Sequence, residues 1–181
     1  MVVGGISQSG GLVKNIWEKG IRKIKEKVRN IENVLILGLG CGTAAEIVNK
    51  ELPDAKIIGI EIDPTVINIG KNYFNLSDIN KIKIIIGDAE NKVNVLPNNY
   101  FDLILVDLYK GKNVPEFLEH EKYLKKIKQK LSKKGMVIFN RLYWKNYTFE
   151  ANKFLDKLKE MFNDVDVKKT YSNILVFAKK F

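Results

Sequence analysis

The chain has 181 residues, of which 45% are hydrophobic and 29% are charged, and this composition is typical of a globular protein. Its length suits one domain that buries about 70% of the surface exposed by the unfolded chain. No apolar run reaches the roughly 18 residues of a membrane span, the start has no export signal, and the single cysteine, Cys41, cannot form an internal disulfide. These features predict a cytoplasmic protein.

The formal net charge of +10 raises the question of a nucleic-acid partner. Only three of the 31 basic residues are arginine, the residue that binds phosphates and bases through two hydrogen bonds at once. Lysine is abundant along the whole chain, so a compositional bias explains much of the excess charge. Nucleic acid is therefore a partner that the composition allows but does not favour.

The first predicted element is an amphipathic helix in residues 12–28, where apolar side chains recur at helical spacing and the polar face is mostly basic. We expect residues 1–30 to form an N-terminal arm and helix, and residues 31–181 to form the main domain. In that domain, apolar runs alternate with segments of helical pattern. The first four predicted strands are residues 33–39, 56–62, 81–88 and 101–108, and the segments between them are residues 43–52, 64–74 and 89–96.

The alternation of strands and helices predicts βαβ units and a parallel sheet with right-handed crossovers. A helix follows in residues 120–131, a fifth strand begins at Gly135, and a further helix covers residues 149–162. The last two runs, residues 164–171 and 173–180, are too close for a crossover and should pair as a hairpin. The predicted fold is α/β: a single Rossmann-like doubly wound domain with a seven-stranded, mostly parallel sheet and a C-terminal antiparallel hairpin.

Three glycines, Gly38, Gly40 and Gly42, end the first predicted strand and precede a helix. Glycine lets a ligand approach the backbone, and the start of a helix offers unpaired N–H groups, so this turn suits a nucleotide-like ligand. The dinucleotide fingerprint has its third glycine at position six, where this chain has Thr43. The spacing G-x-G-x-G therefore favours an adenosine ligand without a pyrophosphate, with a tight packing turn as the structural alternative.

An acidic residue stands at the end of each of the next three strands: Glu61, Asp88 and Asp107. Glu61 lies about 20 residues beyond the glycines, where an acid accepts hydrogen bonds from ribose hydroxyls. Asp88 could accept from an adenine amine, and Asp107 faces the same edge of the sheet. Each acid alone could be a helix cap or turn residue, as we expect for Asp63 before Pro64. Acids at three successive strand ends favour a nucleoside site.

The segments "VLILGLGCGTAAEI", "IIGIEIDPTVI", "IIIGDAENKV" and "DLILVDLYKG" resemble the four motifs of class I S-adenosylmethionine (SAM)-dependent methyltransferases, and more narrowly those of the spermidine synthase-like branch. The resemblance covers roughly residues 31–140. It implies a transferase whose donor is SAM or its decarboxylated form. By this resemblance, the donor-binding residues are Gly38, Leu39, Gly40, Gly42, Glu61, Ile62, Asp88, Ala89 and Asp107. The segment "GGISQSGG" resembles the branch's N-terminal segment and adds Gln8 and Ser9, with a glycine-rich arm as the alternative.

Aminopropyltransferases of this branch carry one acid inside the glycine turn and a pair of acids after the fourth strand. In this chain Cys41 stands at the first position, and of the pair only Asp107 remains, with Lys110 at the other position. A cation there would repel a protonated amine. We also expect no counterpart of the small β-domain that usually precedes the core, since only about 30 residues stand before the first strand. We therefore favour methyl transfer from ordinary SAM to an unidentified small-molecule acceptor.

Asp107 is the candidate catalytic residue that orients or deprotonates the acceptor, and Tyr109 is the candidate that shapes its pocket, with simple packing as the alternative for Tyr109. Displacement at an activated sulfonium methyl needs mainly positioning, so we expect no metal. The segment "RLYWKNY" (141–147) could stack on bases or cover the acceptor pocket, and we favour the pocket. An aminopropyltransferase, an RNA methyltransferase and a non-catalytic SAM-binding module stay open, and a homodimer is expected by analogy.

Overall fold

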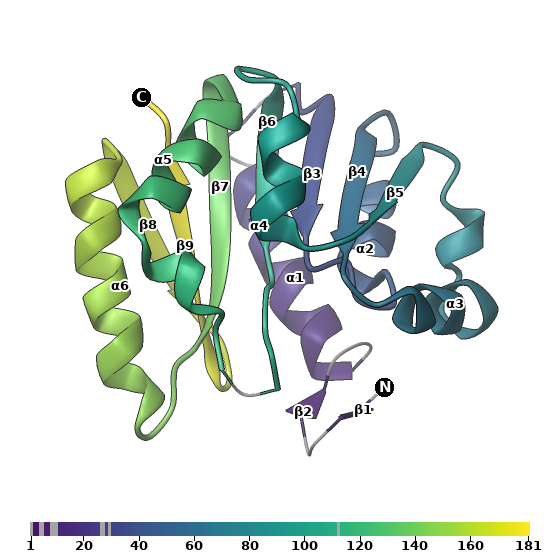
Figure 1. The fold of residues 1–181 in the computed structure, drawn as a ribbon, viewed down its shortest axis with the longest axis horizontal. Helices are drawn as coiled ribbons and strands as arrows, with labels where there is room; N and C mark the ends of the chain where they lie inside the picture. Colours follow the sequence, from purple (N-terminus) through teal and green to yellow (C-terminus); the bar gives the residue numbers. More distant parts are fainter. Residues whose placement is uncertain (1, 4–5, 8–10, 26–27, 29, 112) are drawn as a thin grey trace.

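The computed structural model describes every residue except 1, 4–5, 8–10, 26–27, 29 and 112. It confirms the predicted α/β fold, in which helices cover both faces of a seven-stranded sheet (Figure 1). The strands of this sheet are β3 (Asn33–Leu37), β4 (Lys56–Glu61), β5 (Ile82–Ile86), β6 (Phe101–Val106), β7 (Leu131–Leu142), β8 (Asp164–Lys169) and β9 (Asn173–Lys179). The α-helices are α1 (Gly11–Lys25), α2 (Thr43–Glu51), α3 (Pro64–Tyr73), α4 (Ala89–Lys92), α5 (Glu121–Lys130) and α6 (Tyr147–Met161).

The strand order across the sheet is β5-β4-β3-β6-β7-β9-β8. The first five of these strands are parallel, and β9 is antiparallel to both of its neighbours. The predicted C-terminal hairpin is therefore confirmed, with its second strand inserted next to β7. Because the carboxyl ends of parallel strands meet at one edge of a sheet, the residues that follow β3, β4 and β6 lie at the same edge, toward the bottom of Figure 1.

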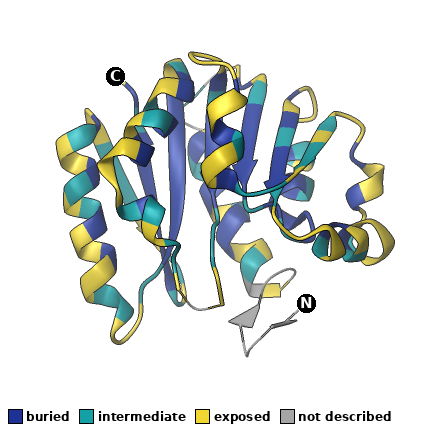
Figure 2. Cartoon of the chain, viewed as in Figure 1, coloured by how far each residue is buried: buried dark blue, intermediate teal, exposed yellow. Residues whose placement is uncertain are grey.

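Apolar side chains of the central strands alternate between the two faces of the sheet. In β3, Val34 and Ile36 belong to the core cluster that packs under α1, α2 and α3, while Leu35 and Leu37 belong to the cluster under α5 and α6. All four side chains are fully buried, and Figure 2 shows the central strands as the most buried part of the molecule. Burial on both faces is the reason why these strands read as continuous apolar runs in the sequence.

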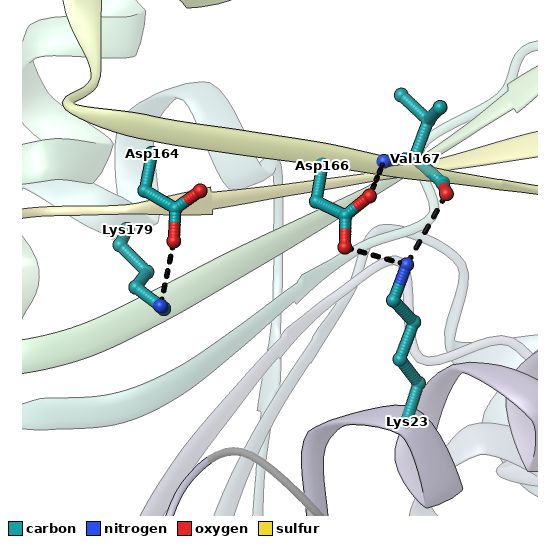
Figure 3. A network of polar contacts seen from close by, with 5 residues as sticks. All are labelled: Lys23, Asp164, Asp166, Val167 and Lys179. Carbon is teal, nitrogen blue, oxygen red and sulfur yellow. Dashed lines mark hydrogen bonds and ion pairs between the residues drawn. The ribbon is translucent and has the colours of Figure 1, made fainter.

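Helix α1 is part of this core, and polar contacts also attach it to the edge of the sheet. Gly20 lets the helix lie close to the sheet, since a Cβ atom there would come within 2.9 Å of Leu175. Lys23 forms an ion pair of 2.7 Å with Asp166 in β8 and donates to the carbonyl oxygen of Val167 (Figure 3).

The division of the chain into an N-terminal part, residues 1–30, and a main domain, residues 31–181, stays a prediction.

Several element boundaries differ from the predicted ones. Strand β7 begins at Leu131 and not at Gly135, because Leu131 pairs with Phe101 before the register shifts. A Cβ atom at Gly135 would lie 2.6 Å from the carbonyl oxygen of Phe101, so this shift requires glycine. The predicted helical segment 89–96 consists of α4 and a 3-10 helix, Val93–Val95. Two further 3-10 helices and a small antiparallel pair were not predicted: Leu76–Asp78, Glu116–Glu119, and β1 (Val2–Val3) with β2 (Ile6–Ser7).

No helix in the described part of the chain is long and apolar enough to cross a membrane.

Candidate functional site

The glycine turn after β3 has a backbone that other residues rarely adopt. The φ angles of Gly38, Gly40 and Gly42 are 84°, 56° and 96°, all in the left-handed region. A Cβ atom on Gly38 would collide with the carbonyl oxygen of Asp107, and one on Gly42 would lie 2.7 Å from Leu76. Close packing inside the protein therefore accounts for two of the three glycines, as the structural alternative predicted, and it brings the turn against the end of β6.

Glu61, at the end of β4, lies directly beside this turn. Its Oε2 accepts a hydrogen bond of 2.8 Å from the backbone N–H of Gly40. Its Oε1 accepts from the N–H groups of Ile62 at 2.9 Å and Asp63 at 3.2 Å. The carboxylate is thus fixed at the turn by three backbone donors, while the residue remains half-buried and open to solvent. A carboxylate held in this way can accept further hydrogen bonds from the two hydroxyls of a ribose.

Two isoleucines neighbour Glu61, one next to it in the chain and one opposite it on β5. Glu61 pairs in register with Ile86 of β5. Ile62 is 63% exposed and Ile86 is 43% exposed, so both side chains are accessible from solvent. Leu39 is buried against Gly59, so it presents only its backbone at the turn. These residues can offer an apolar surface to a flat ring next to a hydroxyl-binding acid.

Two of the predicted acids are helix caps. Asp63 caps α3 by accepting from the N–H of Thr65 at 2.8 Å, which confirms the predicted capping role. Asp88 caps α4 by accepting from the N–H of Glu90 at 2.8 Å through Oδ1, and Ala89 behind it is buried. Capping therefore explains one oxygen of Asp88.

Asp107, directly after β6, receives hydrogen bonds from two distant elements. The indole N–H of Trp17 in α1 donates to Oδ2 at 2.8 Å, and the amide of Asn140 in β7 donates to Oδ1 at 2.8 Å. Asn173 in β9 in turn donates to Oδ1 of Asn140 at 2.9 Å. Loss of solvation on burial raises the pKa of the Asp107 carboxyl, the hydrogen bonds from Trp17 and Asn140 oppose this rise, and the charge of Glu61 adds to it.

Tyr109 follows Asp107 by two residues in the loop after β6, and its hydroxyl forms a hydrogen bond to β7. The O–H donates to the carbonyl oxygen of Asn140 at 2.9 Å. Burial raises the pKa of Tyr109 well above its ordinary value, and the charge of Asp107 raises the pKa further. The phenol is therefore protonated at neutral pH and cannot act as a base, whereas both shaping a pocket and simple packing are compatible with its position.

The loop between β6 and α5 is anchored at its far end. Glu119 forms an ion pair with Arg141, and Lys157 of α6 donates to the carbonyl oxygen of Glu119. The Arg141 side chain is only 5% exposed and its guanidinium lies 4.2 Å from the ring centre of Phe154. Arg141 is therefore a buried anchor, whereas its segment, residues 141–147, was predicted to stack on bases or to cover the acceptor pocket. Lys110, earlier in the loop, is exposed.

Cys41 is buried, and within the described residues it forms no disulfide. Gln8 and Ser9, which the resemblance assigned to the donor, lie outside the described residues. Among the residues whose placement is described, no group of three or more His, Cys, Asp or Glu side chains could hold a metal ion.

Sequence reasoning missed the two partners of Asp107, Trp17 and Asn140, and also Asn173, which binds Asn140. One signal was present for Trp17, because a tryptophan on the buried face of a helix needs a partner for its N–H. Asn140 and Asn173 carried a weaker signal, because Asn140 directly follows an apolar run and Asn173 directly precedes one.

Residues 31–178 match the protein family described as "Methyltransferase domain". The chain is 31% identical over 127 residues to the polyamine aminopropyltransferase of Vibrio vulnificus, and the match covers 69% of this chain and 40% of that protein. It is also 31% identical over 127 residues to the eEF1A lysine and N-terminal methyltransferase homolog of Drosophila melanogaster, covering 65% of this chain and 19% of that one. The crystal structure of a probable spermidine synthase from Corynebacterium glutamicum superimposes with a TM-score of 0.82 at 18% identity, covering 100% of this chain and 68% of that chain. The chain thus spans less than half the length of these two curated relatives.

Proposed function

The chain belongs to the family of methyltransferase domains and has the fold of class I SAM-dependent methyltransferases, and from this premise we propose that it transfers a methyl group from SAM to an acceptor beside Asp107. The resemblance to the spermidine synthase-like branch is confirmed by the relatives as well. One observation carries the proposal: the Glu61 carboxylate is fixed at the glycine turn by the N–H of Gly40, with exposed Ile62 next to it. The Glu61 carboxylate can accept hydrogen bonds from a ribose, and the neighbouring Ile62 side chain offers an apolar surface to a ring, as an adenosine ligand requires.

In the proposed donor site each residue has a defined part. Gly38, Leu39, Gly40 and Gly42 border the amino-acid end of the donor through their backbone, and Glu61 accepts from the ribose. Ile62 packs on the adenine, while Asp88 and Ala89 hold its edge, with the second oxygen of Asp88 as the acceptor. The resemblance also assigns Gln8 and Ser9, which lie outside the described residues, to the donor.

Methyl transfer is favoured over aminopropyl transfer by the side chains at two positions. Where an aminopropyltransferase has an acid inside the glycine turn, this chain has buried, uncharged Cys41, so no carboxylate opposes the carboxylate of ordinary SAM. Where such an enzyme has a second acid after β6, this chain has exposed Lys110, which disfavours a protonated amine.

Bound SAM would supply a methyl group already activated by the positive sulfonium. The protein's own part is to hold the acceptor in line and to receive its proton. Asp107 is suited to this part, because its raised pKa makes its ionised form a better proton acceptor than an ordinary carboxylate. Tyr109 forms the wall of the acceptor pocket. Arg141, near the end of β7, is buried and paired with Glu119, so the residue type best suited to phosphates is not exposed there, which favours a small acceptor over a nucleic acid.

Isothermal titration of the protein with SAM and with decarboxylated SAM tests the donor. We expect ordinary SAM to bind more tightly, and tighter binding of the decarboxylated form would overturn the assignment of methyl transfer. Binding of neither compound would overturn the donor site itself. Incubation with methyl-labelled SAM and fractions of a cell extract then identifies the acceptor by the fraction in which the label appears.

Aminopropyl transfer is the second candidate function. It is favoured by the match to the Vibrio vulnificus aminopropyltransferase and by the retained acid Asp107. Incubation of the protein with decarboxylated SAM and a diamine, followed by chromatography of the products, tests this function. Formation of a longer polyamine would support aminopropyl transfer.

A further inference from the structure

Three side chains form a directed chain of hydrogen bonds that ends on Asp107. Ser172 Oγ donates to Oδ1 of Asn173 at 2.8 Å, and Asn173 Nδ2 donates to Oδ1 of Asn140 at 2.9 Å. Asn140 Nδ2 then donates to Oδ1 of Asp107 at 2.8 Å. The three bonds run in one direction, from the turn before β9, through β9 and β7, to the acid after β6.

The direction of the chain is fixed by chemistry, because each carboxamide has one accepting end and one donating end. The oxygen of Asn173 is taken by Ser172, so its N–H group faces Asn140. The oxygen of Asn140 is thereby taken, and its N–H group is presented to Asp107. Asn140 and Asn173 are only 7% and 6% exposed, and amides buried to this extent cannot exchange these partners for water without cost.

The second oxygen of Asp107 is held from the opposite side of the site. Trp17 in α1 donates its indole N–H to Oδ2, so the carboxyl lies between two neutral donors. The titratable group that acts on it is Glu61 at the end of β4, and the charge of Asp107 in turn acts on Tyr109, whose hydroxyl donates to the backbone of Asn140. Hydrogen bonds from neutral donors favour the ionised carboxylate, which burial disfavours. The charge state of Asp107 is therefore set by a balance in which Asn140 takes part.

We propose that Asn140 and Asn173 are positioning residues, which fix the orientation of the Asp107 carboxylate and keep it ionised through this chain of hydrogen bonds. The proposal rests on the proposed function in so far as Asp107 serves the acceptor, and it assigns the antiparallel strand β9 a part in the site. Neither asparagine contacts the donor or the acceptor; both act through Asp107.

Trp17 provides a readout that needs neither donor nor acceptor, so the outcome is independent of the proposed function. The chain has two tryptophans, and the Trp144→Phe variant leaves Trp17 as the sole tryptophan emitter. Because the Trp17 N–H contacts Asp107 and the indole is fully buried, its fluorescence responds to the charge on that carboxyl. A pH titration of this fluorescence therefore follows the ionisation of Asp107.

In the Trp144→Phe background we expect a fluorescence transition that the further change Asp107→Asn abolishes. Asn140→Leu should raise the midpoint by about one to two pH units, the shift expected when a carboxylate loses one hydrogen bond. Asn173→Leu and Ser172→Ala should raise it by less, because they disturb the chain farther from the acid. Asn146→Ala is the matched control, since this exposed asparagine makes no capping hydrogen bond through its side chain, and its midpoint should not move.

An unchanged midpoint in folded Asn140→Leu and Asn173→Leu proteins would overturn the proposal, and so would a transition that persists in Asp107→Asn. Near-ultraviolet circular dichroism identifies which variants are folded. If the asparagine variants do not fold, Ser172→Ala decides, because Ser172 is only half-buried. A raised midpoint in that variant supports the chain, and an unchanged one refutes it.

Discussion

The backbone N–H of Gly40 donates a hydrogen bond of 2.8 Å to Oε2 of Glu61, so the glycine turn and the end of β4 are joined through one carboxylate. The other oxygen of Glu61 is held by two backbone N–H groups at the start of the next turn. The position of the acid is therefore set before any ligand binds, and binding does not have to order it.

Replacement of Glu61 by Gln should weaken donor binding without unfolding the protein. The amide keeps the size of the side chain, but it loses the charge and presents an N–H group toward backbone donors. Charge-assisted hydrogen bonds are worth about 1.5–3 kcal/mol, so we expect the affinity for SAM or S-adenosylhomocysteine to fall by about 10- to 100-fold. Isothermal titration measures the change. Asp63→Asn, two residues away, serves as the control and should bind normally, and equal affinities of Glu61→Gln and the unmodified protein would contradict the proposed ribose contact.

Replacement of Gly38 by Ala should destabilise the protein more than the same change at Gly111. Both residues have positive φ angles, 84° and 64°, and alanine in that region costs about 1–2 kcal/mol at either position. Only at Gly38 does the new Cβ atom meet the carbonyl oxygen of Asp107, whereas at Gly111 nothing lies within 4 Å. We expect losses in the free energy of unfolding of about 3 kcal/mol or more at Gly38 and about 1 kcal/mol at Gly111. Urea unfolding gives both values, and losses of equal size would show that the turn does not pack against β6.

The raised pKa of Asp107 predicts the sign of a pH effect on stability. In the unfolded chain an aspartate titrates near pH 4, and in the folded protein the pKa is higher because the carboxyl loses solvation. Between these two values the folded state binds more protons than the unfolded state, so stability falls as the pH rises through this window. Asp107→Asn removes this contribution, and its stability relative to the unmodified protein should therefore increase with pH from about pH 4 to the raised pKa.

Urea unfolding at a series of pH values tests this sign. Glu121→Gln is a control for which the sign is reversed. A hydrogen bond from Lys125 lowers the pKa of Glu121, so the stability of this variant relative to the unmodified protein should fall as the pH rises. Parallel stability curves for Asp107→Asn and the unmodified protein would mean that Asp107 titrates normally in the folded state.

The ion pair between Lys23 and Asp166 should couple α1 to β8 only weakly. The nitrogen and oxygen atoms are 2.7 Å apart, but the Asp166 side chain is 41% exposed. Ion pairs in such positions contribute about 0.2–1 kcal/mol, and salt screens them. A double-mutant cycle of Lys23→Met and Asp166→Asn should give a coupling energy in this range that shrinks at high salt. A coupling that salt leaves unchanged would mean that the pair acts by packing and not by charge.

The sequence predicted most of the fold because the strands are buried on both faces and read as continuous apolar runs. It misplaced the start of β7, since the pairing of Leu131 with Phe101 depends on a register shift that no local pattern reports. The acids could be predicted from their places at strand ends, and Asp63 and Asp88 also serve as caps. Trp17 could not be assigned to Asp107, because 90 positions separate the two and only the packing of α1 brings them together.

The insertion of β9 between β7 and β8 has a consequence for how the protein is made. β9 follows β8 in the chain but occupies an inner place in the sheet, so β8 cannot join the sheet before β9 does. Asn173 travels with that strand and reaches Asn140 only then. On the ribosome, Asn140, which binds the acid after β6, therefore acquires its own partner only once β9 has emerged from the exit tunnel.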